Sequence, residues 1–265
     1  MSVRKTRSFR RGHGSGDGNW NRGKERRSHG RVMLYGWHTV TAALANPARQ
    51  IRKLWATENA ARRLTSAGLN SPVAPELVRP DVIAARLSPD AVHQGLLAET
   101  DPLPSRTIAD LPAAAGLVLA LDQITDPHNV GAILRTAAAF AVAAVVTTAR
   151  YSPEATGVLA KSASGALEWV PIVIVTNLAR GLSELKERNF QVIGLDSSAP
   201  DDFSALELTR PLVLVLGAEG AGLRQKTQAT CDRVARLDLP GAIKSLNVSN
   251  AAAVALYIAS RTLRA

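Results

Sequence analysis

Residues 117–140 read LVLALDQITDPHNVGAILRTAAAF. The stretch opens with a continuous apolar run over residues 117–122, which is typical of a strand buried on both faces of a sheet. A polar turn follows, and then an apolar helical pattern over residues 130–140. A buried strand that leads into a helix is the repeating unit of parallel α/β sheets, so this stretch predicts an α/β fold.

The same alternation continues toward the end of the chain. Further strand-like runs occur at residues 144–148, 172–175, 192–195, 212–216 and 234–239. Helical patterns lie between or after most of them, at residues 154–161, 178–188 and 246–263. We therefore expect residues 117–265 to form one parallel sheet that helices cover on both sides.

A second, smaller α/β unit is predicted before this sheet. Residues 32–100 show helical patterns at 36–44, 58–67 and 81–87, and strand-like runs at 51–57, 73–78 and 95–99. Residues 101–116 contain three prolines and few large apolar side chains. We interpret them as a linker that lets the small unit move relative to the sheet.

The first 31 residues differ in composition from the rest of the chain. They hold ten basic and two acidic residues, whereas the whole chain of 265 residues has a net charge of +10. Aliphatic side chains are rare there, so residues 1–31 are predicted to be a disordered basic arm. Such an arm suits a polyanion, because each neutralised phosphate releases bound counterions. Contact with RNA or DNA is favoured over the alternative, a purely solubilising tail.

Composition also excludes several classes of protein. No apolar run reaches the length of a transmembrane helix, and the Arg-rich N-terminus lacks the apolar segment of a secretory signal. The single cysteine, Cys231, excludes an internal disulfide framework and a cysteine-based zinc site. The sequence therefore predicts a cytoplasmic protein without a membrane partner.

Three segments carry the polar residues that are candidates for chemistry. The first, DPHNVGAILR at residues 126–135, follows the strand at 117–122. Asn129 is expected at the N-cap of the helix, at the sheet edge where open α/β sheets bind their ligands. Arg135 lies in an otherwise apolar stretch, where an arginine needs a partner. The alternative is a structural arginine paired with a carboxylate.

The second segment, LVLGAEGAGL at residues 214–223, runs from a buried strand into a glycine-rich loop. Glycines let a ligand approach the backbone closely. Glu219 is the only acid in this loop and a natural partner for Arg135. The glycine order is GxxGxG, which does not fit the GxGxxG pattern of dinucleotide-binding folds. A plain strand–turn–helix loop is the alternative.

The third segment, LDLPGAIKSLNVSNAAAVALY, covers residues 237–257. A helix is expected to begin at Ser245, with Asn247 and Ser249 in its first turn. Free backbone N–H groups at a helix N-terminus favour an electron-rich ligand. Ser245 as an ordinary N-cap is the alternative. The Ala-rich helix is apolar nearly all round, so we expect it to be buried.

Together, NVGAILRTA, LVLGAEGAGL and LPGAIKSLNVSNAAAVALY resemble in order and spacing the three motifs of the SpoU/TrmH family of RNA 2′-O-ribose methyltransferases. This resemblance covers residues 117–264. Residues 34–100, with LYGWHTVTAAL and HQGLLAE, resemble the family's small RNA-binding domain, which is related to ribosomal protein L30e. The chain is most similar to members that methylate a guanosine of 23S ribosomal RNA. It differs from them in its basic arm and in Asn250.

The resemblance implies a C-terminal domain with a trefoil knot, the SPOUT fold, and a homodimer in which helix 246–264 contributes to the interface. It implies S-adenosylmethionine as the cofactor and no metal. The cofactor-binding residues that it implies are Leu216, Gly217, Leu239 and Leu246. Arg135 is implied as the catalytic residue. We interpret it as orienting the nucleotide and stabilising the developing alkoxide. The residues that would hold it and the ribose are Asn129, Glu219, Ser245 and Asn247.

Other functions stay open at this point. A transfer RNA substrate is disfavoured because family members of that kind tend to carry terminal helices and to lack the L30e-like domain. A catalytically inactive RNA-binding protein of the same fold is disfavoured by the intact Asn129, Arg135, Glu219 and Asn247. A nicotinamide-dependent oxidoreductase is disfavoured by the glycine order and by the missing acid on the second strand.

Overall fold

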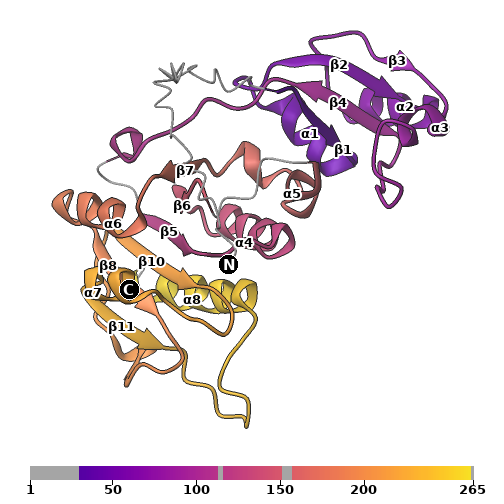
Figure 1. Ribbon diagram of the computed structural model, residues 1–265. Coiled ribbons are helices and arrows are strands. Elements are labelled where there is room, and N and C mark those ends of the chain that lie inside the picture. Colours follow the sequence, from indigo (N-terminus) through magenta and orange to yellow (C-terminus); the bar gives the residue numbers. More distant parts are fainter. Residues whose placement is uncertain (1–29, 113–115, 151–156, 264–265) are drawn as a thin grey trace, which may run out of the picture.

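The computed structural model describes residues 30–112, 116–150 and 157–263. The predicted basic arm therefore lies outside the described residues, apart from its last two. Two α/β units follow one another along the chain (Figure 1). We call them the small unit, with strands β1 to β4, and the large unit, with strands β5 to β11. Within the described ranges, no helix is long and apolar enough to cross a membrane.

A parallel sheet forms the centre of the large unit, with the strand order β7-β6-β5-β10-β8-β11-β9 in the described residues. The strands are β5 (Leu117–Asp122), β6 (Ala144–Thr148), β7 (Ile172–Val175), β8 (Gln191–Leu195), β9 (Asp201–Asp202), β10 (Leu212–Gly217) and β11 (Arg233–Arg236). The helices are α4 (Pro127–Ala139), α5 (Gly157–Ser162), α6 (Leu178–Glu187), α7 (Gln225–Thr230) and α8 (Val248–Thr262), with the short 3-10 helices η2 (Ala166–Glu168) and η3 (Phe203–Ala205).

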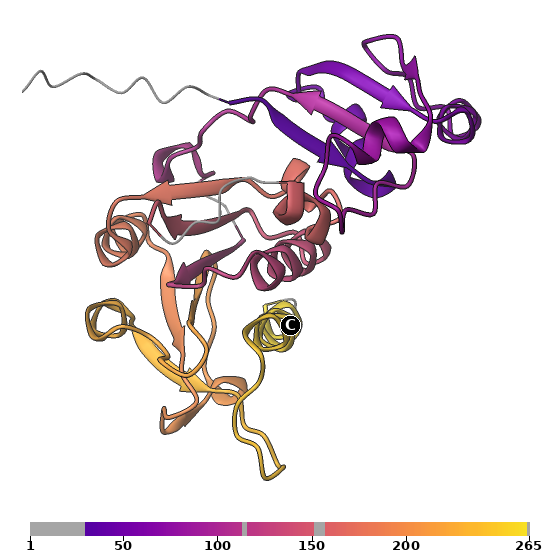
Figure 2. The same cartoon turned by 45° about the vertical axis from the view of Figure 1, so that its right-hand side comes forward.

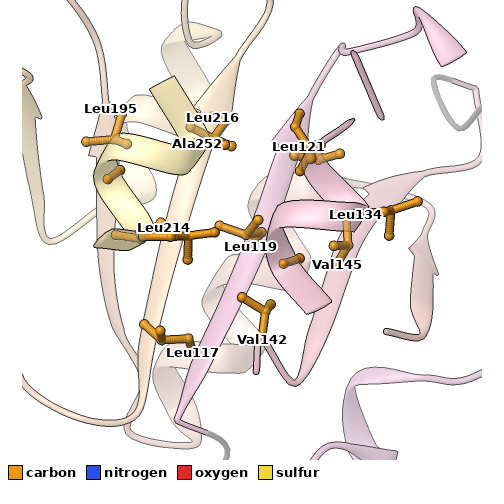
Figure 3. Close-up of a cluster of buried hydrophobic side chains, with 14 of the residues drawn as sticks. Leu117, Leu119, Leu121, Leu134, Val142, Val145, Leu195, Leu214, Leu216 and Ala252 are labelled. Carbon is orange, nitrogen blue, oxygen red and sulfur yellow. The ribbon is translucent and has the colours of Figure 1, made fainter. Parts of the chain in front are cut away.

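Helices cover both faces of this sheet, which confirms the predicted fold class. Alternate residues of β5 point to opposite faces. Leu119 and Leu121 join residues of α4 and α8 in one apolar cluster (Figure 3), whereas Val118 and Ala120 join residues of α6 in another. A strand packed on both faces needs an uninterrupted apolar sequence, which is why the run at 117–122 was informative. The trefoil knot implied by the family resemblance stays a prediction.

The small unit is a mixed sheet with the strand order β1-β4-β2-β3 in the described residues. Its strands are β1 (Val32–Tyr35), β2 (Ile51–Ala56), β3 (Glu76–Leu77) and β4 (Leu96–Thr100), and its helices are α1 (Trp37–Ala45), α2 (Glu58–Ser66) and α3 (Pro80–Ala84). Strand β1 was not predicted, because four residues beside the arm give no periodic signal. Strand β3 is shorter than the predicted run at 73–78, since Pro72 and Pro75 cannot donate ladder hydrogen bonds.

The HQG part of HQGLLAE closes a turn that holds α1 in place. Gln94 accepts a hydrogen bond from the backbone N–H of Trp37 at 2.9 Å, so its side chain satisfies the N-terminus of α1. His93 Nδ1 accepts from the N–H of Gly95 at 3.1 Å. Gly95 has φ +80°, a left-handed conformation that glycine adopts without strain.

The small unit is docked on the large unit (Figures 1 and 2). That the connecting segment lets the small unit move relative to the large one stays a prediction. Arg49 of the small unit and Glu168 of the large unit form a buried ion pair. The predicted linker is not a free tether. Ile108 and Leu111 are buried against α6, and the first of them begins the 3-10 helix η1 (Ile108–Asp110). The prolines of residues 101–116 indicated an irregular backbone but carried no information about these contacts.

Candidate functional site

Two loops of the site start side by side because of the sheet register. Strands β5 and β10 are parallel neighbours, and Asp122 at the end of β5 pairs with Gly217 at the end of β10. The loop from 123 to 126 and the loop from 218 to 224 therefore leave the same edge of the sheet. This is the carboxyl edge, where ligands bind in open α/β sheets.

The N-terminus of α4 differs in detail from the prediction. Asp126, and not Asn129, is the N-cap residue, and its carboxylate accepts a hydrogen bond from the N–H of His128 at 2.9 Å. Pro127 occupies the first helical position, where a missing N–H has no cost. Asn129 thus lies in the first turn of α4 with its side chain free for tertiary contacts.

A polar cluster forms where α4, the glycine-rich loop and α8 meet. Asn129 Nδ2 donates to Glu219 Oε1 at 3.3 Å, and Asn247 Nδ2 donates to the same oxygen at 2.6 Å. Asn247 Nδ2 also donates to Asn129 Oδ1 at 3.0 Å. The backbone N–H of Val248, in the first turn of α8, donates to Glu219 at 3.3 Å. A negative carboxylate is favourable at a helix N-terminus, which fixes Glu219 there.

The start of α8 also corrects a prediction. Asn247, and not Ser245, caps the helix, with its side-chain oxygen accepting from the N–H and hydroxyl of Ser249 at 2.9 and 2.6 Å. Ser245 lies in the exposed segment before the helix. Both serine and asparagine are good N-cap residues, so sequence preference alone does not separate them.

A cavity of about 490 Å³ opens beside this cluster, between the ends of β8 and β10 and the segment that leads into α8. Its walls include every residue that the family resemblance implied for cofactor binding: Leu216, Gly217, Leu239 and Leu246. Glu219 and Ser245 line it as well. The structure therefore brings four of the five predicted catalytic residues to one place, since Asn129 and Asn247 bind Glu219.

Glycine at position 217 is required by the loop itself. A Cβ atom on Gly217 would lie 2.3 Å from the carbonyl carbon of Gly222 and 2.6 Å from the backbone nitrogen of Leu223. The loop folds back on itself there, with the N–H of Gly222 donating to the carbonyl of Ala218 at 2.9 Å. The glycine-rich sequence predicts close approach of a ligand, whereas the contact at Gly217 is with the protein's own backbone.

Asp196 is a cavity residue that the sequence analysis missed. It directly follows β8 and lines the cavity together with Ser197 and Ser198. Burial alone would raise the pKa of Asp196, but hydrogen bonds from the side chain and backbone of Ser198 and from the backbone of Leu223 lower it below its usual value. Its position just after a buried parallel strand is the signal that could have identified it.

Arg135 stands apart from the other predicted catalytic residues. Its side chain is exposed, and no hydrogen bond or ion pair joins it to another residue in the described part of the chain. The predicted contact with Glu219 is not formed, because that carboxylate binds Asn129, Asn247 and the N-terminus of α8. Six residues along an α-helix amount to a rotation of about 240°, so Arg135 and Asn129 point to different sides of α4.

The described residues contain no group of three or more His, Cys, Asp or Glu side chains that could hold a metal ion.

Two family models match the chain, one on each unit. The SpoU rRNA Methylase family matches residues 116–257. The RNA 2′-O ribose methyltransferase substrate binding family matches residues 33–106. Residues 107–115 separate the two matches, which together cover most of the described chain.

Relatives and a solved structure are similar over nearly the whole length. A 23S rRNA (guanosine-2′-O-)-methyltransferase, RlmB, from Pseudomonas putida is 38% identical over 238 residues, which are 86% of this chain and 95% of that protein. The protein of the same name from Vibrio cholerae is 38% identical over 243 residues, 86% of this chain and 96% of that one. The crystal structure of the SpoU methyltransferase AviRb from Streptomyces viridochromogenes, in complex with the cofactor AdoMet, superposes with a TM-score of 0.75 at 23% identity, covering 89% of this chain and 91% of that one.

Proposed function

The chain belongs to the SpoU rRNA methylase family, and from this premise we propose that it methylates the ribose 2′-hydroxyl of a guanosine in 23S ribosomal RNA, using S-adenosylmethionine. One observation carries the proposal. The cluster of Asn129, Glu219 and Asn247 borders the cavity that Leu216, Gly217, Leu239 and Leu246 line. A polar cluster suited to a ribose thus adjoins an apolar cavity suited to the cofactor.

The cavity fits S-adenosylmethionine in size and in chemistry. Its volume of about 490 Å³ is within the usual range for small-molecule sites. Leucine side chains offer an apolar slot for the adenine, while Asp196 and Glu219 supply negative charge and Lys244 one positive charge. The cofactor carries a sulfonium, an ammonium and a carboxylate. Its positive groups can therefore pair with the acidic side chains of the cavity, and its carboxylate with Lys244. When bound, it supplies an activated methyl group.

The polar cluster is organised to hold a ribose. Glu219 Oε1 takes the hydrogen bonds from Asn129, Asn247 and Val248, and Oε2 accepts none from the described residues. That oxygen can accept a hydrogen bond from a substrate hydroxyl. The connected hydrogen bonds fix the orientation of both asparagine amides before substrate binds, which lowers the entropic cost of positioning.

Arg135 acts on the nucleotide from a separate position on α4. A guanidinium stays protonated at neutral pH, so it does not take the 2′-hydroxyl proton as an ordinary base would. Its five N–H donors suit a phosphate or the alkoxide that develops as the hydroxyl loses its proton. A phosphate oxygen of the RNA is the group that receives this proton.

The small unit is proposed to select the RNA. It carries exposed cations over several elements: Arg52, Lys53, Arg62, Arg63, Arg79 and Arg86. RNA is recognised largely through shape and through bases in loops and bulges, which needs an extended contact surface. A single ribose pocket offers too few groups for that, so residues 32–100 supply the second surface.

A homodimer is proposed from the exposed side of α8. The helix buries one face against the sheet, whereas Asn250, Val254, Tyr257 and Arg261 are among its exposed residues. These positions form one stripe along the helix, and its centre is apolar, with Val254 39% and Tyr257 58% exposed. Sedimentation velocity tests this. Tyr257→Asp should shift the protein to monomer, whereas Leu77→Asp, equally exposed on the small unit, should leave the dimer intact.

Ribose methylation mapping tests the activity directly. Total RNA from a strain lacking the gene, incubated with the protein and S-adenosylmethionine, should gain one methylated guanosine ribose in 23S ribosomal RNA. Methylation only on transfer RNA would assign the alternative substrate, and no methylation with intact cofactor binding would identify an inactive RNA-binding protein.

Titration calorimetry tests the cavity. Ser197 is exposed at the cavity wall, so Ser197→Trp should fill the cavity without disturbing the core. We expect the affinity for S-adenosylmethionine to fall about 10-fold or more. Ser66→Trp, on the exposed side of α2, is the matched control and should bind normally. Equal affinity of both variants would place the cofactor elsewhere.

A further inference from the structure

The contact between the two units is built around one buried carboxylate. Glu168 Oε1 accepts from Arg49 Nη2 at 2.7 Å, and both carboxylate oxygens lie 3.1 Å from Arg49 Nε. Asn46 Nδ2 donates to Glu168 Oε2 at 2.8 Å. The Arg49 and Glu168 side chains keep only 5% and 2% of their exposure. The charged groups are thus satisfied by partners and not by water, as a buried ion pair requires.

The same guanidinium also binds the start of the connecting segment. Arg49 Nη1 donates to the backbone carbonyl of Asp101 at 2.9 Å. Arg49 therefore holds three parts of the chain together, namely its own loop after α1, the start of the connecting segment and η2 of the large unit. A planar guanidinium can do this because its donors point in fixed directions.

Close backbone packing surrounds this ion pair. Gly165, with φ +84°, lies so near α1 that a Cβ atom would be 2.5 Å from Ala42 Cβ and 2.9 Å from the carbonyl of His38. Thr39 Oγ1 donates to the carbonyl of Ala160 at 3.2 Å in a buried position. Ala160 belongs to the apolar core of the small unit although it lies on α5. The two units thus share a core at this point.

The interface leads directly to the helix that carries Asn129 and Arg135. Helix α5 packs on α4 so closely that a Cβ atom on Gly131 would lie 2.3 Å from Ser162 Cβ. Next to Ser162 on the same helix, Lys161 Nζ donates to the carbonyl of Val92 in the small unit at 2.5 Å. Rigid contacts therefore run from α1 through α5 to α4, without a loop in between.

We propose that the Arg49–Glu168 ion pair is a positioning pair, which locks the small unit at one place on the large unit and so sets the distance between the RNA-binding surface and the ribose that is methylated. This rests on the proposed function for the identity of the substrate. Arg49 and Glu168 act through the domain arrangement and touch neither cofactor nor ribose. The pair thereby contributes to the choice of nucleotide.

Glu168→Gln in the full chain tests the proposal, because glutamine keeps the shape and removes the charge that Arg49 needs. Cysteines at the exposed positions Ser66 and Ser183 carry two spin labels, one on each unit. The half-buried Cys231, whose pKa burial raises to about 12, stays unlabelled. We expect one narrow distance in the parent protein and a broad or second distance in the Glu168→Gln variant. Glu187→Gln, an exposed change of the same charge, is the matched control.

Methylation gives the functional readout. Glu168→Gln should raise the KM for a ribosomal RNA fragment about 10-fold and add methylation at neighbouring riboses, with S-adenosylmethionine affinity within about two-fold of the parent. Asn46→Ala, which removes one hydrogen bond to Glu168, keeps the test usable if the first variant does not fold, and should give a smaller effect of the same kind. Unchanged distances in a folded variant, or broad distances with unchanged KM and selectivity, would overturn the positioning role. An inactive parent protein would instead contradict the proposed function.

Discussion

Asp122 at the end of β5 accepts hydrogen bonds from the backbone N–H and from Nε of Arg224, at 3.0 and 2.7 Å, although the two residues are 102 positions apart. The Asp122 side chain is fully buried, and that of Arg224 keeps 41% of its exposure. Arg224 ends the glycine-rich loop and caps α7. The pair therefore ties the loop after β10 to the end of β5, and so fixes the spacing of the two loops that form the site.

Replacing this buried carboxylate should cost stability. Asp122→Asn keeps the size but removes the charge opposite Arg224. We expect the free energy of unfolding to fall by about 2 kcal/mol, the scale for hydrogen bonds between charged groups. Urea denaturation measures it. Asp238→Asn, in an exposed pair with Arg236 at 3.6 Å, is the control and should change stability by less than about 1 kcal/mol. Equal effects in the two variants would contradict the argument.

The sheet could be predicted because its strands are buried on both faces. The runs at 117–122, 144–148 and 172–175 match β5, β6 and β7 at both ends. Short elements such as β1 and β9 were missed, since pairing with a neighbouring strand decides them and local sequence does not. The strand order could not be predicted either, because β10 enters between β5 and β8 through a long-range connection.

Site residues that belong to a sequence motif could be predicted. Those that are brought together only by tertiary contacts were missed. Glu219 and Asn247 were identified from their motifs, but the Arg135–Glu219 pairing was wrong because nothing local shows which helix face meets the loop. Arg49 and Glu168 were not considered at all, since 119 positions separate them and each alone looks like a surface residue. A truncated chain of residues 110–265 would contain Glu168 but not its partner Arg49.

Any side chain at Gly217 should lower the stability of the fold, in addition to any effect on cofactor binding. Gly217→Ala places a Cβ atom against the backbone of Gly222 and Leu223, at 2.3 to 2.6 Å, and backbone atoms cannot move aside cheaply. We expect a loss of about 1–3 kcal/mol in thermal or urea unfolding. Gly116→Ala is the control, because its nearest neighbour is a flexible Arg210 side chain at 3.5 Å. Full stability of Gly217→Ala would show that the loop relaxes.

Arg135 should affect methyl transfer and not cofactor binding. It is exposed and is not among the residues that line the cavity. Arg135→Lys keeps the positive charge and loses the planar fork, so single-turnover methylation should fall about 10²-fold. Titration with S-adenosylmethionine should give the parent affinity. Arg180→Lys on α6 provides the control for a conservative change on the surface. Normal turnover with lysine would remove Arg135 from the mechanism.

Cys231 should be unreactive in the folded protein. Burial, together with the neighbouring Asp232, raises the pKa of its thiol to about 12. The thiolate is the reactive form, so at pH 8 the group is held as the unreactive thiol. Iodoacetamide should leave the native protein unmodified and alkylate it in urea, as mass spectrometry can follow. Rapid alkylation at pH 8 without denaturant would show that α7 opens locally.

The basic arm should contribute RNA affinity without contributing selectivity. Deleting residues 1–29 removes nine basic and two acidic residues and keeps the Arg31–Glu99 ion pair at the edge of the small unit. For every phosphate that the arm neutralises in the parent protein, its deletion should lower the slope of log affinity against log salt by roughly one unit. The methylated nucleotide should stay the same, because the proposal assigns its choice to the small unit and to its position on the large unit. A scrambled arm of the same composition should behave as the parent if charge alone is responsible. An unchanged salt slope after deletion would show that the arm does not bind RNA, and a changed target nucleotide would show that it takes part in selection.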